Sequence, residues 1–354
     1  MKILAFETSC DDTSIAIFQD EKLLAMNTDS QIKIHNQTGG VVPEVAAREH
    51  ANVIFDVLQK TLDDAKTTLD DIDYIWVTTN PGLLPSLLTG TTVASMLSTL
   101  KNIPILPINH IEAHIFANFL EREEVDVKFP LICLTVSGGH NDIYSMKSMW
   151  ELEKLWSSWD DAWGEAFDKV AKMMWLGYPW GPIISKLSDE YEQELIKKWE
   201  VLHSQKTAAE KHWEKTMFPR VWLVKKEHNF SFSGLKSSVK REVDNRIAQN
   251  WELTINDQKE IAYEFETAIT EVLAYKLVQA AKQQNVKTVM LAGWVSANNR
   301  LKDEIARLCK KERLEFMHPT KLVYCMDNAA MVWILTYYRV KHGQFKEHVW
   351  VVKI

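Results

Sequence analysis

The order of apolar segments along the chain is the feature that most constrains its fold. Residues 2–6 form a short apolar run, a polar turn follows, and a second apolar run covers residues 14–18. This pattern predicts a β-hairpin with acidic and hydroxyl side chains at its tip. Beyond it, short apolar runs alternate with segments whose apolar residues recur at helical spacing. Strands that alternate with helices indicate an α/β protein.

The alternation occurs in both halves of the chain. In the first half we expect a helix over 49–65, a strand over 74–79, a helix over 87–100, a strand over 103–108 and then a helix with two histidines. In the second half we expect strands over 131–136, 141–146 and 287–292, with a turn over 293–298 that leads into a helix. Asp257 and Glu260 have the spacing of a capping box, which predicts a helix start there. With 354 residues, the chain is long enough for two lobes.

Charge and cysteine content narrow the class of protein. A net charge of −7 argues against a protein whose whole surface binds nucleic acid. Local basic patches remain possible, although each could equally be a solvated face: Lys225, Lys226, Lys236, Lys240 and Arg241 form one, and Lys310, Lys311 and Arg313 another. No apolar run reaches 18 residues, so we expect no membrane span. The four cysteines form no CxxC pair, which predicts a reduced, cytoplasmic protein.

Two histidines four residues apart are the first candidate for chemistry. On a helix, His110 and His114 would lie on one face and could bind one Zn²⁺ or Fe ion. Asp327 is our candidate for a third ligand, and the alternative is that it caps the helix that follows. A zinc protease would carry its glutamate directly after the first histidine. Here Glu112 comes one position later, about 200° around the helix from His110, and should point away from the metal.

Three further segments could contact a nucleotide. Ser137, Gly138 and Gly139 close the strand over 131–136, where backbone amides can approach an anion, although a plain hairpin turn is the alternative. Asp168 lies ahead of a Gly-Pro loop and could accept a hydrogen bond from a ribose hydroxyl, unless it is a solvated helix residue. The segment over 292–298 joins a strand to a helix, which suits a nucleotide but also an ordinary loop.

Taken together and in this order, the motifs resemble the TsaD family, also called Gcp or YgjD. The resemblance runs from about residue 3 to about residue 340. Its motifs are Glu7-Thr8-Ser9-Cys10-Asp11-Asp12, Gly39-Gly40-Val41-Val42-Pro43-Glu44, Asn109-His110 with His114, Val136-Ser137-Gly138-Gly139-His140, Gly164-Glu165-Ala166-Phe167-Asp168-Lys169, Phe230-Ser231-Phe232-Ser233-Gly234-Leu235-Lys236, Val295-Ser296-Ala297-Asn298 and Asp327-Asn328.

The resemblance implies an actin-, Hsp70- and sugar-kinase-like (ASKHA) α/β fold of two similar lobes with a cleft between them. The first lobe would cover 1–108 and be completed by 325–354, and the second would cover 109–324. The resemblance also implies one divalent metal per subunit, held by His110, His114 and Asp327. Fe²⁺ is the metal we expect, with Zn²⁺ or Mg²⁺ as alternatives. The residues implied to line the substrate site are Thr135, Val136, Ser137, Gly138, Gly139, Asp168, Gly181, Asn298 and Asp11.

The implied reaction is an acyl transfer. The exocyclic amine of adenosine 37, in tRNAs that read codons beginning with adenine, attacks the carbamoyl carbon of threonylcarbamoyl-AMP, and AMP leaves. The leaving group is already activated, so Cys10 needs no nucleophilic role. The implied partners are tRNA, a TsaB-like paralogue and a TsaE-like ATPase, with no membrane. The alternatives are a metalloprotease, a non-catalytic ATP-binding scaffold and a sugar kinase of the same superfamily.

Tryptophan stands at several positions where the family pattern has glycine: Trp156, Trp175, Trp180 and Trp294. The chain has only 12 glycines but 14 tryptophans, against an average glycine content of about 7%. Either the indoles are real and the chain is an altered paralogue, or the gene comes from an organism that reads the codon UGA as glycine. In the second case the sequence was translated with a code that reads UGA as tryptophan. The second hypothesis explains the deficit and the excess together.

Overall fold

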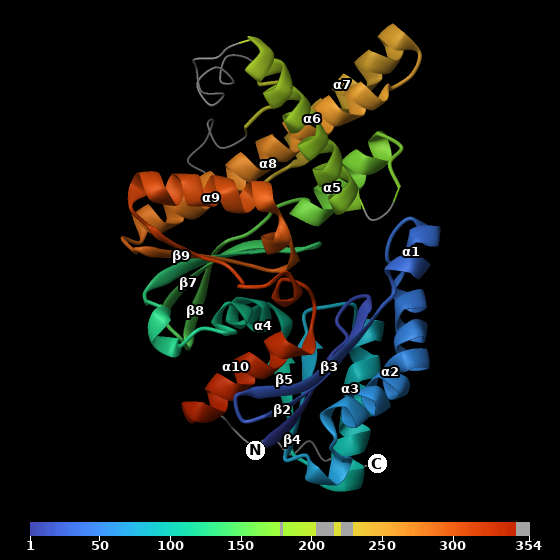
Figure 1. The fold of residues 1–354 in the computed structure, drawn as a ribbon, viewed down its shortest axis with the longest axis vertical. Coiled ribbons are helices and arrows are strands. Elements are labelled where there is room, and N and C mark those ends of the chain that lie inside the picture. Colours follow the sequence, from blue (N-terminus) through green and yellow to red (C-terminus); the bar gives the residue numbers. More distant parts are fainter. Residues whose placement is uncertain (178–179, 203–215, 221–228, 345–354) are drawn as a thin grey trace. The chain divides into compact units, whose positions relative to one another are not determined.

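The computed structural model describes residues 1–177, 180–202, 216–220 and 229–344 (Figure 1). The chain divides into two compact units. The first contains Met1–Val127, Ala292–Trp294 and the segment that starts at His318, and the second contains Lys128–Leu291 and Val295–Met317. The first unit therefore continues past residue 108, because the helix with the two histidines packs on the C-terminal helix α10 (Ala329–Lys341).

The first unit is built on a five-stranded sheet in the order β3-β2-β1-β4-β5. The hairpin at the N-terminus is confirmed, and β1 is antiparallel to β2 with Leu4 opposite Ile17. β4 pairs with β1, and β5 pairs with β4, both in parallel. The strands are β1 (Lys2–Glu7), β2 (Asp12–Gln19), β3 (Lys22–Ser30), β4 (Tyr74–Asn80) and β5 (Ile105–Asn109).

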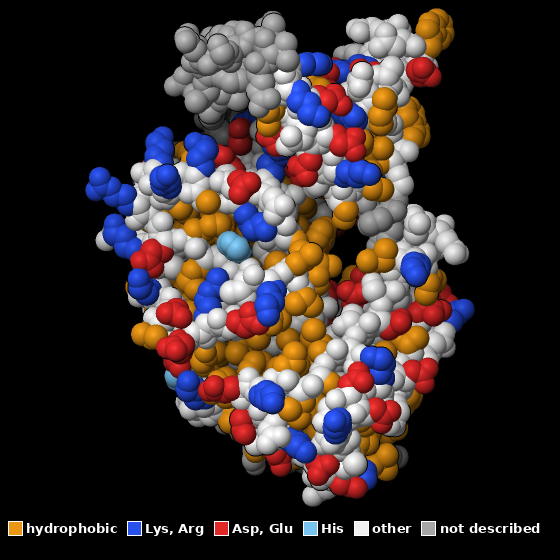
Figure 2. Space-filling model, viewed as in Figure 1, with side chains coloured by type: hydrophobic (Ala, Val, Ile, Leu, Met, Phe, Trp, Pro, Cys, Tyr) orange, Lys and Arg blue, Asp and Glu red, His pale blue; other side chains and the backbone are white. Residues whose placement is uncertain are grey.

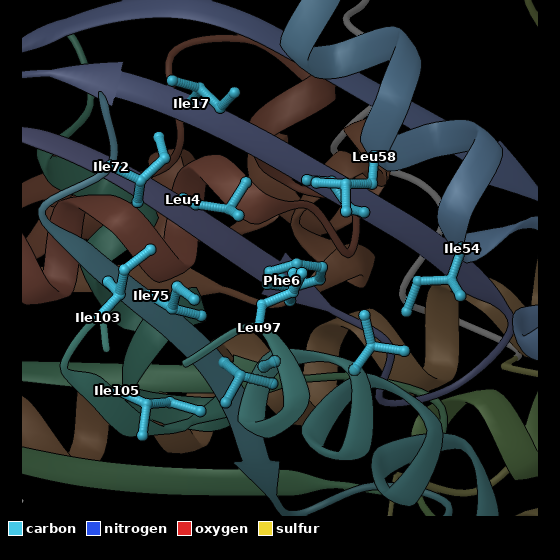
Figure 3. Close-up of a cluster of buried hydrophobic side chains, with 14 of the residues drawn as sticks. Leu4, Phe6, Ile17, Ile54, Leu58, Ile72, Ile75, Leu97, Ile103 and Ile105 are labelled. Carbon is cyan, nitrogen blue, oxygen red and sulfur yellow. The ribbon is translucent and has the colours of Figure 1, made fainter. Parts of the chain in front are cut away.

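Helices cover the central strands on both faces, which is why β1 is apolar along most of its length. Leu4 and Phe6 face α2 (Pro43–Ala65) and α3 (Leu84–Lys101) in a core that includes Ile54 and Leu97 (Figure 3). Helix α10 contacts β1, β2 and β4. There the ring of Phe18 stacks on Trp333 with centroids 4.1 Å apart.

The second unit repeats this topology in the order β8-β7-β6-β9-β10. In each sheet the first strand of the unit is central, the next two strands form an antiparallel meander on one side, and two strands that are parallel to each other lie on the other side. The duplicated order confirms the predicted α/β fold of two similar lobes. The strands are β6 (Leu131–Val136), β7 (Asn141–Ser148), β8 (Glu151–Trp156), β9 (Thr288–Ala292) and β10 (Glu315–Met317).

The helices of the second unit are α5 (Trp163–Met173), α6 (Trp180–Leu202), α7 (Ser233–Asn250), α8 (Ile255–Gln283) and α9 (Asn299–Glu312).

The predicted N-cap of helix α8 lies three residues too late in the sequence. Thr254, and not Asp257, is the N-cap: its hydroxyl accepts from the Asp257 amide at 3.2 Å, and the Asp257 carboxylate accepts from the Thr254 amide at 3.0 Å. Asp257 is thus the third residue of the capping box, because the helix begins at Ile255, six residues before its apolar pattern starts at Ile261.

The sequence pattern also missed the helices α1, α6 and α7 and three strands. Helix α1 (Ile32–Thr38) has only one buried residue, His35, so it shows no apolar stripe. The strands β3, β8 and β10 lie at sheet edges, and most of their residues are partly or fully exposed. Edge strands of this kind lack the alternation on which strand prediction depends. Helix α2 starts at Pro43, six residues before the expected start, with the proline in its first turn.

Candidate functional site

The two histidines lie side by side at the end of strand β5. Asn109 ends that strand and caps helix α4 (His110–Phe116), since its side-chain oxygen accepts a hydrogen bond from the Glu112 amide at 3.1 Å. The rings of His110 and His114 are 4.5 Å apart, and both side chains are buried. The predicted spacing on one helix face is therefore confirmed.

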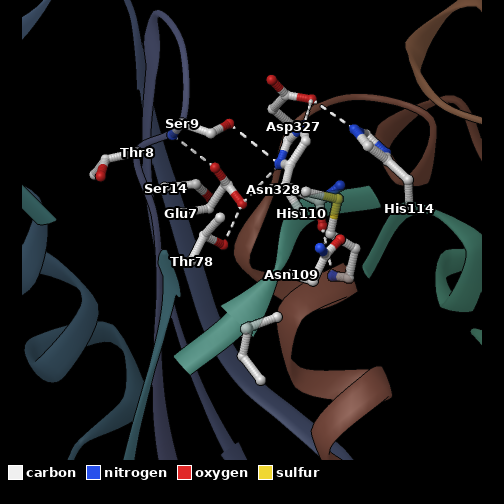
Figure 4. A network of polar contacts seen from close by, with 12 residues as sticks. Glu7, Thr8, Ser9, Ser14, Thr78, Asn109, His110, His114, Asp327 and Asn328 are labelled. Atoms are coloured by element: carbon white, nitrogen blue, oxygen red, sulfur yellow. Dashed lines mark hydrogen bonds and ion pairs between the residues drawn. The ribbon is translucent and has the colours of Figure 1, made fainter. Parts of the chain in front are cut away.

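Asp327 joins this pair from a distant part of the chain (Figure 4). Its Oδ1 lies 2.9 Å from Nε2 of His114 and 3.7 Å from Nε2 of His110. One ligand atom from each of the three residues lies within 4.8 Å of the others, so the cluster could hold a metal ion. The alternative that Asp327 caps α10 is wrong, because Asn328 is the N-cap and accepts from the Met331 amide at 3.1 Å.

Glu112 points away from this cluster, as its position on the helix predicted. Its carboxylate forms an ion pair with Arg339 of helix α10. A glutamate engaged in this way lacks the placement of a metalloprotease general base beside the metal.

A second set of polar residues contacts the edge of the His110 ring opposite to the edge that faces Asp327. Nδ1 of His110 lies 3.2 Å from the Glu7 carboxylate and 3.1 Å from the Ser9 hydroxyl. Thr78 donates a hydrogen bond to Glu7 at 2.6 Å. Sequence reasoning assigned no role to these residues. The one available signal was a charged residue, Glu7, that ends an apolar strand.

Electrostatics in the cluster follow from burial and close opposite charges. Burial disfavours the charged imidazolium, but Glu7 and Asp327 outweigh it and raise the pKa of His110 to about 9. Burial would raise the pKa of Asp327, yet His110 and His114 lower that pKa to about 2. Without a metal, the opposite shifts of these two pKa values favour an ion pair of the His110 imidazolium and the Asp327 carboxylate.

Helix α2 contacts the tip of the β1–β2 hairpin through His50. His50 of α2 contacts the Thr13 hydroxyl at 2.7 Å and the Cys10 carbonyl at 3.0 Å. Asp11, predicted to lie near the substrate, is partly buried, and burial raises its pKa. Burial and the neighbouring Asp11 also raise the pKa of Cys10, which keeps this thiol protonated and agrees with our expectation that it is not a nucleophile.

The predicted anion-binding turn lies in the second unit. Thr135 and Val136 end strand β6, where Val136 pairs with Asn141 of β7. The amide of Ser137 donates to the His140 carbonyl at 2.8 Å, so this residue closes a hairpin turn and its amide is already used. Among the described residues, the amides of Gly138 and Gly139 have no hydrogen-bond acceptor. These two amides remain available to an anion.

The same turn packs against the start of helix α5. The carbonyls of Ser137 and Gly138 accept from the amides of Gly164 and Glu165 at 3.4 and 3.2 Å. A Cβ on Gly164 would lie 2.6 Å from Cα of Gly138, so only glycine fits there. Asp168 follows one turn later on α5, where burial raises its pKa to about 6 against the opposing charges of Lys172 and Lys169.

Asn298 and the helix that carries Gly181 meet in a polar network. Gly181 lies in the first turn of α6, and Ser185 follows one turn later. The side chain of Asn298 caps α9 by accepting from the Leu301 amide at 2.8 Å, and it donates to Glu266 at 2.7 Å and to Ser185 at 3.2 Å. Asn298 therefore has a structural role that the sequence did not reveal.

The backbone conformation at Trp175 and Trp294 shows whether these positions need glycine. Trp175 adopts a φ of 55° and is 68% exposed. Trp294 lies in a short 3-10 helix without a positive φ, and it is Gly293 before it that has a φ of 86°. Trp156 is buried at the end of β8, opposite Ile143. Trp180 begins α6, and its side chain lies outside the described residues.

Part of the first basic patch also lies outside the described residues, namely Lys225 and Lys226. Two other residues of this patch form ion pairs: Lys236 with the buried Asp161, and Lys240 with Asp244. The second patch is exposed at the C-terminal end of α9. Across the described helices, none is both long enough and apolar enough to cross a bilayer.

Comparison with known proteins identifies the family. The model of the family TsaD, tRNA N6-adenosine threonylcarbamoyltransferase, matches residues 22–333. A protein of Fusobacterium nucleatum with that name is 39% identical over 345 residues, covering 97% of this chain and 93% of the relative. One of Persephonella marina with the same name is 41% identical over 347 residues, covering 97% and 91%.

Solved structures resemble the chain more distantly. Component A of (R)-2-hydroxyglutaryl-CoA dehydratase from Acidaminococcus fermentans aligns with a TM-score of 0.49 at 11% identity, covering 96% of this chain and 99% of that one. An ROK hexokinase from Thermus thermophilus aligns with a TM-score of 0.47 at 12% identity, covering 96% and 100%. The family match and the two relatives carry the assignment: this chain belongs to the tRNA N6-adenosine threonylcarbamoyltransferases and is a transferase.

Proposed function

We propose that this chain transfers the threonylcarbamoyl group from threonylcarbamoyl-AMP to the N6 amine of adenosine 37 in tRNAs that read codons beginning with adenine. The amine nitrogen forms a bond to the carbamoyl carbon, the bond from that carbon to the phosphate oxygen breaks, AMP leaves, and the amine loses a proton. The observation that carries the proposal is the cluster of two buried histidines, His110 and His114, with the partly buried Asp327 in a chain of this family.

A divalent metal fits this ligand set. Two imidazoles with one carboxylate suit Fe²⁺, which we favour, as well as Zn²⁺; Mg²⁺ is the less suitable third candidate because it prefers oxygen ligands. The orphan Nδ1 atom of His114 is buried without a hydrogen-bond partner among the described residues, so this ring faces the carboxylate through Nε2. When bound, the metal would orient the threonyl group and polarise an oxygen of the substrate.

We assign the adenylate to the residues that the family resemblance named. Thr135, Val136, Ser137, Gly138 and Gly139 would hold the phosphate or the developing oxyanion, and the unengaged amides of the two glycines suit this role. Asp168 would accept from a ribose hydroxyl. Gly181, Asn298 and Asp11 would complete the site. The side chain of Asn298 already caps α9, so we expect it to contact the ligand only by exchanging its bond to Ser185 or Glu266.

An exposed apolar row on helix α3 supports the proposed TsaB-like partner. The row consists of every fourth residue of the helix from 84 to 100. Its members are large exposed apolar side chains except at Thr92: Leu84, Leu88, Met96 and Leu100. Phe55 of the adjacent helix α2 is 51% exposed. Apolar rows of this kind mark protein–protein contacts. The TsaE-like ATPase and the cytoplasmic location rest on the family alone.

The tRNA would need a local basic surface because the chain is acidic overall. Lys310, Lys311 and Arg313 at the end of α9 are the remaining candidate. Figure 2 shows basic side chains gathered at the edge of the molecule where α9 lies. The alternative is that they only balance the negative C-terminal end of the helix dipole.

A modification assay tests the proposal. The chain is mixed with its TsaB-like and TsaE-like partners, ATP, tRNA and threonylcarbamoyl-AMP, and modified adenosine is measured after nuclease digestion. We expect product from the chain with glycine at 156, 175, 180 and 294, and at least 100-fold less after His114→Ala or Asp327→Ala. Glu112→Gln should keep activity, because Glu112 pairs with Arg339. No product from the glycine version would refute the function.

The same preparations test the rivals. Peptide cleavage that Glu112→Gln abolishes would establish a metalloprotease. ATP-dependent phosphorylation of a sugar that needs only Mg²⁺ would establish a kinase. ATP binding without turnover or bound metal would establish a scaffold.

A further inference from the structure

A buried carboxylate, Glu7, lies behind the metal ligands and contacts only one of them. It ends strand β1, and its side chain is 0% exposed. A carboxylate in such a place is tolerated only when hydrogen bonds replace its hydration. The partners of Glu7 therefore indicate what its charge is used for.

Three donors converge on this carboxylate (Figure 4). The Ser9 amide donates to Oε1 at 2.7 Å, and the Thr78 hydroxyl donates to Oε2 at 2.6 Å. Nδ1 of His110 lies 3.2 Å from the same Oε2. Thr78 lies on β4, the strand next to β1 in the sheet. Residues of the sheet therefore hold the carboxylate in place independently of its contact with His110.

This arrangement decides which nitrogen of His110 carries a proton. An ionised carboxylate only accepts hydrogen bonds, so the proton of a neutral His110 belongs on Nδ1, with Ser9 as a second acceptor. The lone pair is then on Nε2, the atom that faces Asp327. His114 has no comparable support, because its Nδ1 is buried without a partner in the described part of the chain.

We propose that Glu7 is a positioning residue, which holds the His110 ring and its tautomer and thereby sets the metal affinity of the centre. The inference rests on the proposed metal centre and adds to it a residue that does not touch the metal. Partners of this kind typically change metal affinity by about 10–100-fold when they are replaced.

Glu7→Gln is the most informative substitution because it keeps the size of the side chain. If its oxygen accepts from the Ser9 amide, its NH₂ group faces His110 and favours the tautomer with the proton on Nε2. The nitrogen that faces Asp327 then has no lone pair for a metal. If the amide is flipped, the NH₂ group faces the Ser9 amide, and two donors oppose each other. Either orientation weakens the centre.

Metal affinity is measured in the full chain with Co²⁺ by visible absorption and with Zn²⁺ by competition against a chelator. We expect Glu7→Gln to weaken both metals by about 10–100-fold. Thr78→Val, which removes one donor to Glu7, should weaken binding less, and Thr78→Ser should restore it. Glu112→Gln is the matched control, since this glutamate lies on α4 but pairs with Arg339, and it should bind as the unmodified chain does.

The protonation state of the His110 ring is a second readout, and a purely structural role of Glu7 would not determine it. In the Zn²⁺-loaded chain, the two-bond ¹H–¹⁵N NMR spectrum should show His110 protonated at Nδ1. Unchanged affinity in Glu7→Gln, with an unchanged circular dichroism spectrum, would overturn the proposal. If Glu7→Gln fails to fold, the Thr78 pair decides: equal affinity in Thr78→Val and Thr78→Ser also overturns it. If His114→Ala binds metal as well as the unmodified chain, the metal centre itself is wrong, and not only the role of Glu7.

Discussion

At the residue scale, Trp175 occupies a backbone position that glycine normally takes. It follows helix α5, where its amide donates to the Lys172 carbonyl at 3.1 Å and the next amide, of Leu176, donates to Ala171 at 2.9 Å. These two bonds define a Schellman motif, whose left-handed residue is usually glycine. Trp251 follows α7 with a left-handed backbone too, at a φ of 65° and 93% exposure, and its amide donates to the Ile247 carbonyl at 2.7 Å. The left-handed backbone at both exposed indoles is what the recoding hypothesis expects, although Lys66 and Arg313 end α2 and α9 with the same backbone.

We predict that Trp175→Gly and Trp251→Gly each raise the free energy of unfolding by about 1 kcal/mol, because a left-handed backbone is costly for a residue with a Cβ. Thermal unfolding checks this. Trp159→Gly is the control, since Trp159 is exposed but has no positive φ, and there glycine should not stabilise. Mass spectrometry of the protein from its own organism gives the direct answer: tryptophan in the peptides that contain 175 and 251 would refute the recoding hypothesis.

Asp168 is the second residue at which fold and function oppose each other. Burial raises its pKa to about 6, above the value of about 3.9 in an unfolded chain. The folded state thus favours the neutral acid. The stability that this preference gives is complete below pH 4 and is lost as the pH rises through 6. At neutral pH the chain keeps a charge that costs stability.

Asp168→Asn should therefore raise the stability of the second unit at pH 7.5 by about 1–2 kcal/mol and leave it unchanged near pH 4. It should also weaken adenylate binding, because the neutral amide oxygen of asparagine accepts a hydrogen bond from the ribose more weakly than the carboxylate does. Calorimetric unfolding at both pH values, together with titration of AMP, checks this. The exposed Asp303 of α9 is the control, and Asp303→Asn should change neither quantity. A stability gain at pH 4 equal to that at pH 7.5 would contradict the explanation.

At the scale of elements, helix α3 closely approaches the end of strand β1, next to the buried Glu7. A Cβ on Gly90 of α3 would lie 2.2 Å from Oγ1 of Thr8, which is fully buried and follows Glu7. The Thr8 hydroxyl in turn donates to the Ser86 carbonyl at 3.1 Å. The helix can pack this closely only because residue 90 is glycine.

Gly90→Ala should lower the free energy of unfolding by about 1–3 kcal/mol, since the new methyl group must displace Thr8 from a closely packed site. Gly234→Ala is a matched control. Gly234 lies in the first turn of α7, where a Cβ would meet nothing within 4 Å, so alanine should stabilise by about 0.5–1 kcal/mol. Denaturant titration of both variants measures the difference, and equal effects would show that the contact with Thr8 is unimportant.

At the scale of the whole molecule, the apolar row on α3 predicts how the chain assembles. Leu88→Glu places a charge in the middle of this row, where Leu88 is 54% exposed. It should weaken binding of the TsaB-like partner at least 10-fold, which is about 1.4 kcal/mol, and leave the unfolding temperature unchanged. Isothermal titration calorimetry checks this. Val125→Glu, at an exposed apolar residue outside the row, should bind normally, and equal loss in both variants would refute the docking site.

The sequence by itself determined the elements and the family. The N-terminal hairpin, the strands β4, β6 and β9 and the histidine pair follow from local periodicity, because neighbouring residues in one helix or strand fix these patterns. The family motifs named Asp327 as a candidate ligand before any geometry was known. Edge strands and the true cap of α8 escaped because their signals are local and weak.

Only the tertiary structure decided what these residues do together. Glu7, Thr78 and His110 lie on β1, β4 and α4, so no spacing along the chain reveals that they contact one another. The structure likewise gave the capping role to Asn328 and left Asp327 to the histidines. Contacts of this kind depend on how strands pair and helices pack across a hundred or more residues, and that packing is a property of the folded chain as a whole.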